Sequence, residues 1–293
     1  MSSTSNTIKE YVQACTVTLR DGTVLPSLGQ GTWHMGDDSG LRQQEIEALR
    51  TGLDCGMTVI DTAEMYGGGK AEELVGEAVK GRREEAFLVS KVLPNNAGGK
   101  KLEEACEGSL SRLGVDQLDL YLLHWRGSIP LKETVRDMEK LKADGKIKRW
   151  GVSNLDVRDM KELLSLEHGN NAVCDQVLYH LASRGIEFDL MPWMKEQQMP
   201  VIAYCPLDQG GGRTLGESRT LQEIAERRSM TPLQIALAWT IQSGMVLSIP
   251  KTSNPAHVRE NAGAASVTLA NEELEMLDRA FPKPQTKQPL DIV

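Results

Sequence analysis

Eight short apolar segments recur along this chain, and longer segments with helical periodicity lie between them. The apolar segments occupy 28–33, 58–61, 87–92, 118–125, 147–154, 174–180, 201–207 and 245–251. Most are nearly continuous apolar runs, which is typical of parallel strands buried on both faces. Eight strand–helix units in one chain predict an α/β fold, specifically a closed (β/α)8 TIM barrel.

Helices are predicted where apolar residues recur every three or four positions. The clearest helical segments are 43–55, 70–81, 101–114, 133–145, 156–166 and 231–243. Asp156 and Thr231 are the expected N-caps, and Pro232 follows at a first helical position. Before the barrel, apolar and polar residues alternate on both sides of Asp21 and Gly22, which predicts an N-terminal β-hairpin cap.

The chain has 293 residues, enough for two average domains, but TIM barrels also reach this length. An open doubly wound sheet is the competing arrangement. Against it, Gly29 and Gly31 are followed by Thr-Trp-His, so no Gly-x-Gly-x-x-Gly motif forms. We expect one domain over 1–293, with a leader at 1–10 and a tail at 282–293 whose position the sequence leaves open.

Charge and cysteine spacing exclude several kinds of partner. The 33 basic and 41 acidic residues give a net charge of −8 without a basic cluster, so neither nucleic acid nor a membrane surface is an expected partner. The five cysteines lie far apart, and we expect no metal site. With no signal-peptide pattern at the N-terminus, we expect a cytoplasmic protein. The oligomeric state stays open, and a monomer is compatible with the sequence.

Polar side chains that can take part in acid–base chemistry lie at the ends of three consecutive predicted strands. Asp61 ends the second strand, Lys91 the third and His124 the fourth, and Tyr66 lies in the loop after Asp61. TIM-barrel active sites lie at this end of the strands, so we expect the four side chains to meet. Singly, Asp61 could be a helix cap and His124 a core histidine; together they indicate a site.

The four residues suit protonation of a carbonyl oxygen. Tyrosine has a pKa near 10, so we expect Lys91 to lower the pKa of Tyr66 and Asp61 to keep Lys91 charged. His124 would orient the carbonyl by a hydrogen bond. A cofactor must supply hydride, because no side chain does so.

In the contexts IDTAEMYG, LVSKV and LLHW, these residues resemble the aldo-keto reductase superfamily over essentially the whole chain. The resemblance implies a catalytic tetrad of Asp61, Tyr66, Lys91 and His124, with Tyr66 as general acid and NADPH as cofactor. The segments GQGTWHMG, LLHWRGS and QVLYHLASRGIEFDL resemble the bacterial methylglyoxal reductases within it. That implies small aldehydes, α-oxoaldehydes or ketones as substrates.

The resemblance also implies residues that bind substrate and cofactor. Trp33 and Trp125 flank the expected mouth of the barrel, where they could form apolar walls around the substrate or simply pack at the barrel rim. The implied cofactor-binding residues include Gly31, Thr32, Trp33, Asp61 and His257. The others are implied for particular parts of the cofactor: Ser153, Asn154 and Gln176 for the nicotinamide carboxamide, Tyr204 for the nicotinamide ring, Cys205 and Leu207 for the pyrophosphate, Lys251, Thr252 and Ser253 for the 2′-phosphate, and Glu260 and Asn261 for the adenine. His257 stands where many members have an arginine that contacts the 2′-phosphate, and an imidazole attracts phosphate less strongly. NADPH is therefore expected, with NADH as an alternative.

Two other functions stay compatible with the sequence. Lys91 could form a Schiff base in an aldolase, although Asp61 beside it would keep the ammonium protonated. A redox-sensing module would bind NADPH with little turnover, as ion-channel β-subunits of the superfamily are thought to do. The prediction is an NADPH-dependent reductase of small aldehydes such as methylglyoxal, whose physiological substrate the sequence does not specify.

Overall fold

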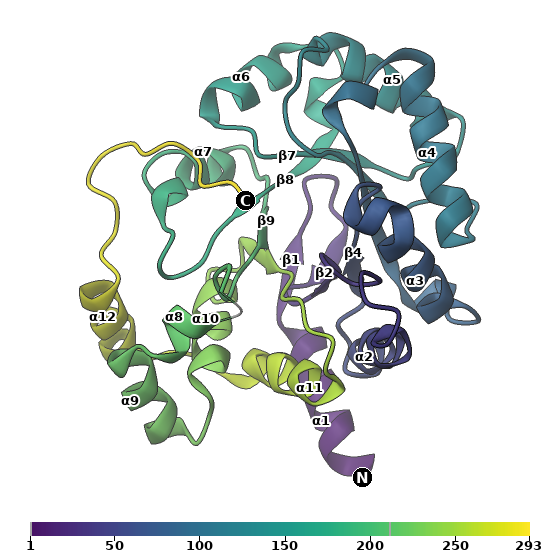
Figure 1. Cartoon of the computed structure of the whole chain (residues 1–293). Helices are drawn as coiled ribbons and strands as arrows, with labels where there is room; N and C mark the ends of the chain where they lie inside the picture. Colours follow the sequence, from purple (N-terminus) through teal and green to yellow (C-terminus); the bar gives the residue numbers. More distant parts are fainter. Residues whose placement is uncertain (1, 211) are drawn as a thin grey trace.

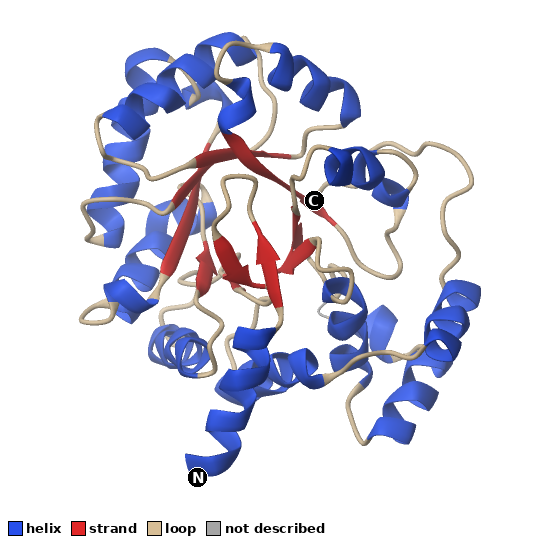
Figure 2. Cartoon of the chain, turned by 180° about the vertical axis from the view of Figure 1, so that it is seen from behind, coloured by secondary structure: helices blue, strands red, loops and turns tan. Residues whose placement is uncertain are grey.

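A computed structural model describes residues 2–210 and 212–293. In it, all eight predicted barrel strands form one parallel sheet in sequence order. Figure 2 shows the strands ringed by helices. The barrel strands are β3 (Gln30–Gly31), β4 (Val59–Asp61), β5 (Phe87–Val92), β6 (Leu120–Leu123), β7 (Trp150–Ser153), β8 (Ala172–Leu178), β9 (Val201–Tyr204) and β10 (Val246–Ser248). This order confirms the predicted (β/α)8 architecture.

Helices surround the sheet (Figure 1). They are α1 (Ser2–Ala14), α2 (Arg42–Asp54), α3 (Lys70–Val79), α4 (Gly99–Leu113), α5 (Leu131–Ala143), α6 (Val157–Ser165), α7 (Leu190–Glu196), α8 (Arg213–Gly216), α9 (Arg219–Arg228), α10 (Pro232–Ile241), α11 (Pro255–Gly263) and α12 (Asn271–Ala280). Both predicted caps form: Asp156 accepts the N–H of Val157, and Thr231 makes a capping box with Gln234. Most of the expected leader is helical in α1, and Met1 lies outside the described residues.

The segment around β3 closes the barrel against β10. Leu28 and Ser248 form a parallel bridge, and the N–H of Gly29 donates to the carbonyl of Ser248 at 2.8 Å. One residue further on, the N–H of Gly31 donates to the carbonyl of Pro250 at 3.1 Å. These bonds join the first and last barrel strands, as a closed barrel requires.

The two-residue alternation of a strand divides the barrel interior into an apolar and a polar part. Alternate side chains point inward. In β5, Val89 and Lys91 point inward. In β6, Leu120 and Leu122 point inward, and His124 continues this series just after the strand. Val89, Leu120 and Leu122 belong to one buried apolar cluster. Because the polar residue comes last in each series, the chemistry lies at the carboxyl end of the strands.

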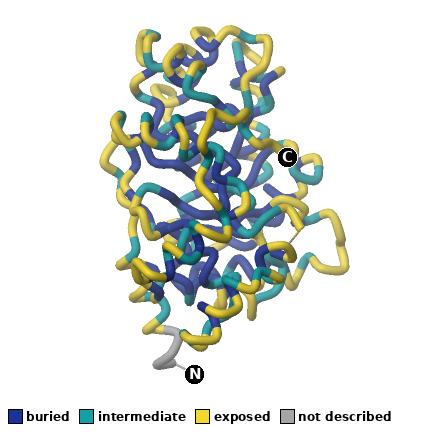
Figure 3. Tube along the Cα trace, turned by 90° about the vertical axis from the view of Figure 1, so that its left-hand side faces the viewer, coloured by how far each residue is buried: buried dark blue, intermediate teal, exposed yellow. Residues whose placement is uncertain are grey.

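The predicted hairpin seals the other end of the barrel. Strands β1 (Thr16–Thr18) and β2 (Val24–Pro26) pair antiparallel. Leu19 and Leu25 of this hairpin belong to the same apolar cluster as the inward residues of the strands. Figure 3 shows the buried segments gathered at the centre of the molecule. The hairpin therefore extends the core and leaves the carboxyl end as the open one.

None of the helices formed by the described residues is long and apolar enough to cross a membrane.

Asp175 in β8 is a fully buried carboxyl group that faces away from the barrel interior, toward α6. It precedes the inward-facing Gln176, and neither of its oxygens has a hydrogen-bond partner of ordinary geometry among the described residues. Burial raises the pKa of Asp175 far above its ordinary value, and the nearby backbone amide of Leu155 offsets only part of this rise. The folded protein therefore binds a proton here that the unfolded chain releases above about pH 4.

We predict that Asp175→Asn stabilises the protein at neutral pH. A raised carboxyl pKa makes the wild type lose stability as pH rises above about 4, and the amide removes that loss, with a gain of about 2 kcal/mol near neutrality. Urea unfolding near about pH 5 and about pH 8 measures it. The control Asp119→Asn should destabilise, because Asp119 accepts bonds from Arg83 and Lys148. A less stable Asp175 variant at the higher pH would contradict the prediction.

Candidate active site

The carboxyl ends of three neighbouring strands bring the four predicted catalytic side chains together. Asp61 ends β4, Lys91 lies in β5 and His124 directly follows β6. The Nζ atom of Lys91 is 2.5 Å from Oδ1 of Asp61 and 3.3 Å from the hydroxyl of Tyr66. The rings of Tyr66 and His124 lie edge to face, with centroids 5.8 Å apart. The predicted cluster thus forms around Lys91.

Lys91 and Asp61 form an ion pair that is shielded from water. Their exposed fractions are 0% and 2%. Burial alone would lower the pKa of Lys91, but the charge of Asp61 and the oxygen of Tyr66 outweigh burial and raise it. Burial raises the pKa of Asp61, while Lys91 and the Gln176 amide oppose that rise. Lys91 therefore keeps its proton at neutral pH, as predicted.

Lys91 acts on the pKa of Tyr66 in the predicted direction, since its charge and its hydrogen bond both lower that pKa. Burial of the phenol, with a smaller contribution from the charge of Asp61, raises the pKa and outweighs Lys91. The net pKa of Tyr66 in the free protein therefore lies above the ordinary value of tyrosine. Spacing identifies Lys91 as a neighbour, but the depth of burial decides the sign of the shift. Tyr66 carries its proton at neutral pH.

Burial and, to a smaller extent, the charge of Lys91 lower the pKa of His124 to about 3. Its Nδ1 atom is buried and has no hydrogen-bond partner in the described part of the chain. The backbone carbonyl of His124 accepts a hydrogen bond of 3.2 Å from the amide of Asn154. The imidazole is neutral at neutral pH, so one ring nitrogen carries a hydrogen and the other a lone pair.

Three consecutive glycines let the chain turn sharply after Tyr66. Gly67, Gly68 and Gly69 have φ of 58°, 64° and 98°, which is the left-handed region that other residues rarely adopt. A Cβ atom at Gly69 would lie 2.5 Å from the side chain of Arg112. The turn leads directly into α3 and so holds Tyr66 over the barrel end.

A hydrogen-bond chain links the predicted nicotinamide residues to Asp61. The hydroxyl of Tyr204 donates to Oδ1 of Asn154 at 2.9 Å, and Nδ2 of Asn154 donates to the hydroxyl of Ser153 at 3.1 Å. Ser153 donates to the backbone carbonyl of Gln176 at 2.8 Å. The side-chain amide of Gln176 donates to Oδ2 of Asp61 at 2.7 Å. These side chains therefore hold one another in place beside the catalytic cluster.

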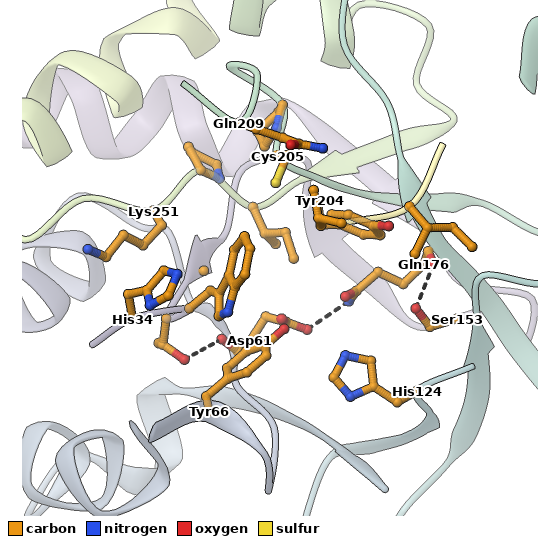
Figure 4. A pocket seen from close by; sticks show the side chains of 18 of the residues that line it. His34, Asp61, Tyr66, His124, Ser153, Gln176, Tyr204, Cys205, Gln209 and Lys251 are labelled. Atoms are coloured by element: carbon orange, nitrogen blue, oxygen red, sulfur yellow. Dashed lines mark hydrogen bonds between the residues drawn. The ribbon is translucent and has the colours of Figure 1, made fainter. Parts of the chain in front are cut away.

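One cavity of about 470 Å³ joins most of the predicted site residues (Figure 4). Its lining includes Gly31, Thr32, Trp33, Asp61, Tyr66, His124, Trp125, Ser153, Asn154, Gln176, Tyr204, Cys205, Leu207 and Lys251. Trp125 is half-buried and packs on His124, while Trp33 is more exposed at the mouth. Lys91 is fully buried and acts from behind the lining. The structure thus gathers the predicted substrate residues and one side of the predicted cofactor site.

The loop after β9 is fixed in a conformation that few side chains adopt. Cys205 and Asp208 have φ of 49° and 71°. The carboxylate of Asp208 accepts backbone N–H bonds from Gly212 at 3.0 Å and Thr214 at 3.1 Å, at the start of α8. Burial raises the pKa of the Cys205 thiol to about 11, so it stays protonated. Unusual backbone conformations of this kind cluster at functional sites.

The predicted phosphate-binding residues lie in the segment between β10 and α11. Lys251 is exposed and lines the cavity, and the hydroxyl of Thr252 accepts the N–H of Asn254 at 3.1 Å. His257 is exposed on α11. Arg259, the nearest arginine, places its charge beside the thiol of Cys55 at the end of α2.

The two residues predicted to lie near the adenine, Glu260 and Asn261, belong to α11 and do not line this cavity. Glu260 is exposed, and its backbone carbonyl accepts a bond of 2.8 Å from the amide of Gln234. Asn261 is buried beside Thr252 in a smaller cavity.

Ile292 and Val293 line the cavity, although sequence reasoning gave them no role. The chain after α12 crosses to the mouth of the barrel (Figure 1), and Lys287 forms ion pairs with Asp156 and Asp189 at 2.8 and 2.7 Å. The tail has no periodic pattern, so only the charge of Lys287 could have indicated where it is held. His34 and Met65 also line the cavity without a predicted role.

Comparison with known proteins identifies one family. The model of the "Aldo/keto reductase family" matches residues 27–281. Methylglyoxal reductase YeaE of Escherichia coli (strain K12) is 55% identical over 271 residues, which cover 92% of this chain and 95% of that protein. Glyoxal reductase of Bacillus subtilis (strain 168) is 35% identical over 266 residues, covering 90% and 91% of the two chains.

A solved structure of an aldo/keto reductase from Klebsiella pneumoniae in complex with NADP and acetate is also similar. It shares 52% sequence identity and superposes with a TM-score of 0.93, covering 95% of this chain and 99% of that one. A second structure of an aldo-keto reductase from the same organism, in complex with NADPH, matches with the same values.

We predict that His124 stays neutral well below the ordinary pKa of histidine, about 6.5. Its pKa of about 3 arises mainly from burial, so the imidazole signals should not shift between about pH 8 and pH 5. NMR of ring-labelled protein measures this, and loss of one signal in His124→Gln assigns the residue. An inflection of that signal above about pH 5.5 would show that burial does not control the titration.

Proposed function

Because this chain belongs to the aldo/keto reductase family of oxidoreductases, we propose that it is an NADPH-dependent reductase of small aldehydes, methylglyoxal among them. The observation that carries the proposal is the contact of Lys91 with both Asp61 and Tyr66, beside a neutral His124. The names of the similar reductases support the substrate class, and the NADP and NADPH complexes support the cofactor.

Tyr66 is the proposed proton donor. When bound, NADPH supplies the hydride that reaches the carbonyl carbon of the substrate. Tyr66 then donates its phenolic proton to the carbonyl oxygen and becomes negatively charged. Lys91, 3.3 Å away, stabilises that charge without moving. Burial favours the protonated phenol before the reaction. During the reaction, Lys91 lowers the energy of the phenolate that forms when Tyr66 gives up its proton.

His124 is proposed to orient the carbonyl oxygen. Its Nδ1 has no hydrogen-bond partner among the described residues, and in the proposed role Nδ1 carries the lone pair and Nε2 the hydrogen. A neutral imidazole can donate that hydrogen to a carbonyl oxygen without adding a second positive charge beside Lys91. The substrate would then be held between two donors, His124 and Tyr66, with Trp125 as an apolar wall.

The cavity fits an extended dinucleotide better than a compact ligand. Amide and hydroxyl groups of Asn154, Ser153 and Gln176 lie at one end, where a carboxamide can bond to them, and the Tyr204 ring offers a flat face. At the other end the exposed ammonium of Lys251 provides a positive charge for a phosphate. The two ends are joined by the loop that contains Cys205 and Leu207.

The aldolase alternative is not favoured by the electrostatics of the site. A Schiff base requires an unprotonated amine, and Lys91 has a raised pKa. Its amine is also fully buried behind Tyr66 and Asp61, away from the cavity surface.

We predict that Tyr66→Phe lowers kcat for methylglyoxal reduction by about 100-fold or more, because general acid catalysis contributes roughly 10² to 10⁴. Binding of NADPH, read from quenching of tryptophan fluorescence, should be retained. NADPH oxidation at 340 nm measures the rate. Turnover near that of the wild type in the variant would remove Tyr66 from the proposed role. Tight NADPH binding with negligible turnover by the wild type would instead favour the redox-sensing module.

We predict that Lys251→Ala weakens NADPH binding by about tenfold and leaves NADH binding nearly unchanged, since one ion pair with a phosphate is removed. Michaelis constants and dissociation constants for both cofactors measure the effect. Lys283→Ala, which removes an exposed lysine of the tail, is the matched control. An equal loss with both cofactors would contradict the assignment of Lys251 to the 2′-phosphate.

A further inference from the structure

Glu45 is a buried carboxylate that contacts the predicted phosphate-binding segment. It lies in the first turn of α2 and is 1% exposed. Its Oε1 accepts the hydroxyl of Ser253 at 3.0 Å, and its Oε2 accepts the backbone N–H of Gly36 at 2.9 Å. The neighbouring Gln44 donates to the backbone carbonyl of Ser253 at 2.9 Å. The start of α2 therefore holds Ser253 from two sides.

The hydroxyl of Ser253 is committed to this carboxylate. A serine hydroxyl has one hydrogen, and in the structure that hydrogen is donated to Glu45. The oxygen of Ser253 then presents only lone pairs to other ligands. A phosphate beside Ser253 could not receive a hydrogen bond from this side chain unless the bond to Glu45 were broken.

Glu45 has no ion-pair partner in the part of the chain that the structure describes. Among the described residues, no lysine, arginine or histidine forms an ion pair with it. Arg42 in the same helix pairs with Glu77. Arg259 acts on Cys55 at the far end of α2, about 15 Å along the helix from Glu45. A buried carboxylate with no ion-pair partner in the described part of the chain thus lies directly behind Ser253.

From this arrangement we infer that Glu45 is a specificity-determining residue that weakens the preference for a 2′-phosphorylated cofactor and lets NADH compete with NADPH. The inference rests on the proposed function, because it takes Lys251 to Ser253 as the 2′-phosphate site. Two negative groups repel, and repulsion is strong where water does not screen it. The ribose hydroxyl of NADH carries no charge and is not repelled.

A purely structural role for Glu45 is the alternative. Its bonds to Gly36 and Ser253 hold α2 against two loops, and any loss of them could reduce stability. Gln preserves the shape of Glu, and its carbonyl can still accept the Gly36 N–H. Its NH₂ group can donate to the oxygen of Ser253, which frees the serine hydrogen. The two roles therefore separate in Glu45→Gln.

The experiment measures dissociation constants by isothermal titration calorimetry for NADP⁺, NAD⁺, adenosine 2′,5′-bisphosphate and ADP. In Glu45→Gln we expect NADP⁺ and the 2′,5′-bisphosphate to bind about tenfold more tightly, with NAD⁺ and ADP unchanged. Glu47→Gln removes the same charge from the exposed face of α2 and should change each constant by less than about twofold. Glu45→Asp retains the charge and should not tighten NADP⁺ binding.

Glu45→Met, which removes the charge together with both hydrogen bonds, provides a second variant if Glu45→Gln folds poorly, which thermal unfolding will show. We expect it also to bind NADP⁺ more tightly, with NAD⁺ binding unchanged. Unchanged or parallel constants for the two cofactors in the folded variant overturn the inference. If the Glu45 variants show no such effect, Lys251→Ala separates the two explanations. Intact NADP⁺ binding in Lys251→Ala means that the proposed phosphate site itself is wrong. Weakened NADP⁺ binding in Lys251→Ala means that the phosphate site stands and only the role of Glu45 fails.

Discussion

The buried ion pair between Lys91 and Asp61 is the interaction on which the carboxyl end of the barrel depends. Removing two charges from water costs several kcal/mol for each, so the pair persists only with good geometry and further hydrogen bonds. Thr62 and Gln176 supply these bonds. The pair in turn places a positive charge against Tyr66 at the polar end of the barrel interior. The same contact thus satisfies a buried lysine and, in the proposed mechanism, stabilises the negative charge that develops on Tyr66.

The polar groups around this pair behave as one unit. Hydrogen bonds run from Tyr204 through Asn154 and Ser153 to Gln176, and from there to Asp61. Asn154 has φ of 59°, which an asparagine tolerates better than most residues. A change at any member alters the partner of the next, so groups that would touch a cofactor are coupled to groups that would touch the substrate. Such networks are rigid when every member is satisfied.

Sequence reasoning located the strands, the hairpin and the four clustered side chains because each has a local signal. Lys91 follows an apolar run, and parallel strands end at one edge. The sign of the Tyr66 pKa shift had no local signal, because it depends on how deeply the phenol is buried. The contact of Glu45 with Ser253 joins residues 208 positions apart along the chain, and neither residue is unusual in its own segment. The position of Ile292 is likewise set by distant ion pairs.

The alternation of inward and outward side chains also determines which genetic changes this site can withstand. A substitution in β5 alters one side chain, but a single inserted or deleted codon ahead of Lys91 exchanges the two faces of the strand from that point. Lys91 would then face the surrounding helices, and an outward neighbour such as Val92 would face Asp61. Length variation among relatives should therefore be confined to loops, while the strands keep a constant number of residues between the hairpin-sealed end and the open end of the barrel.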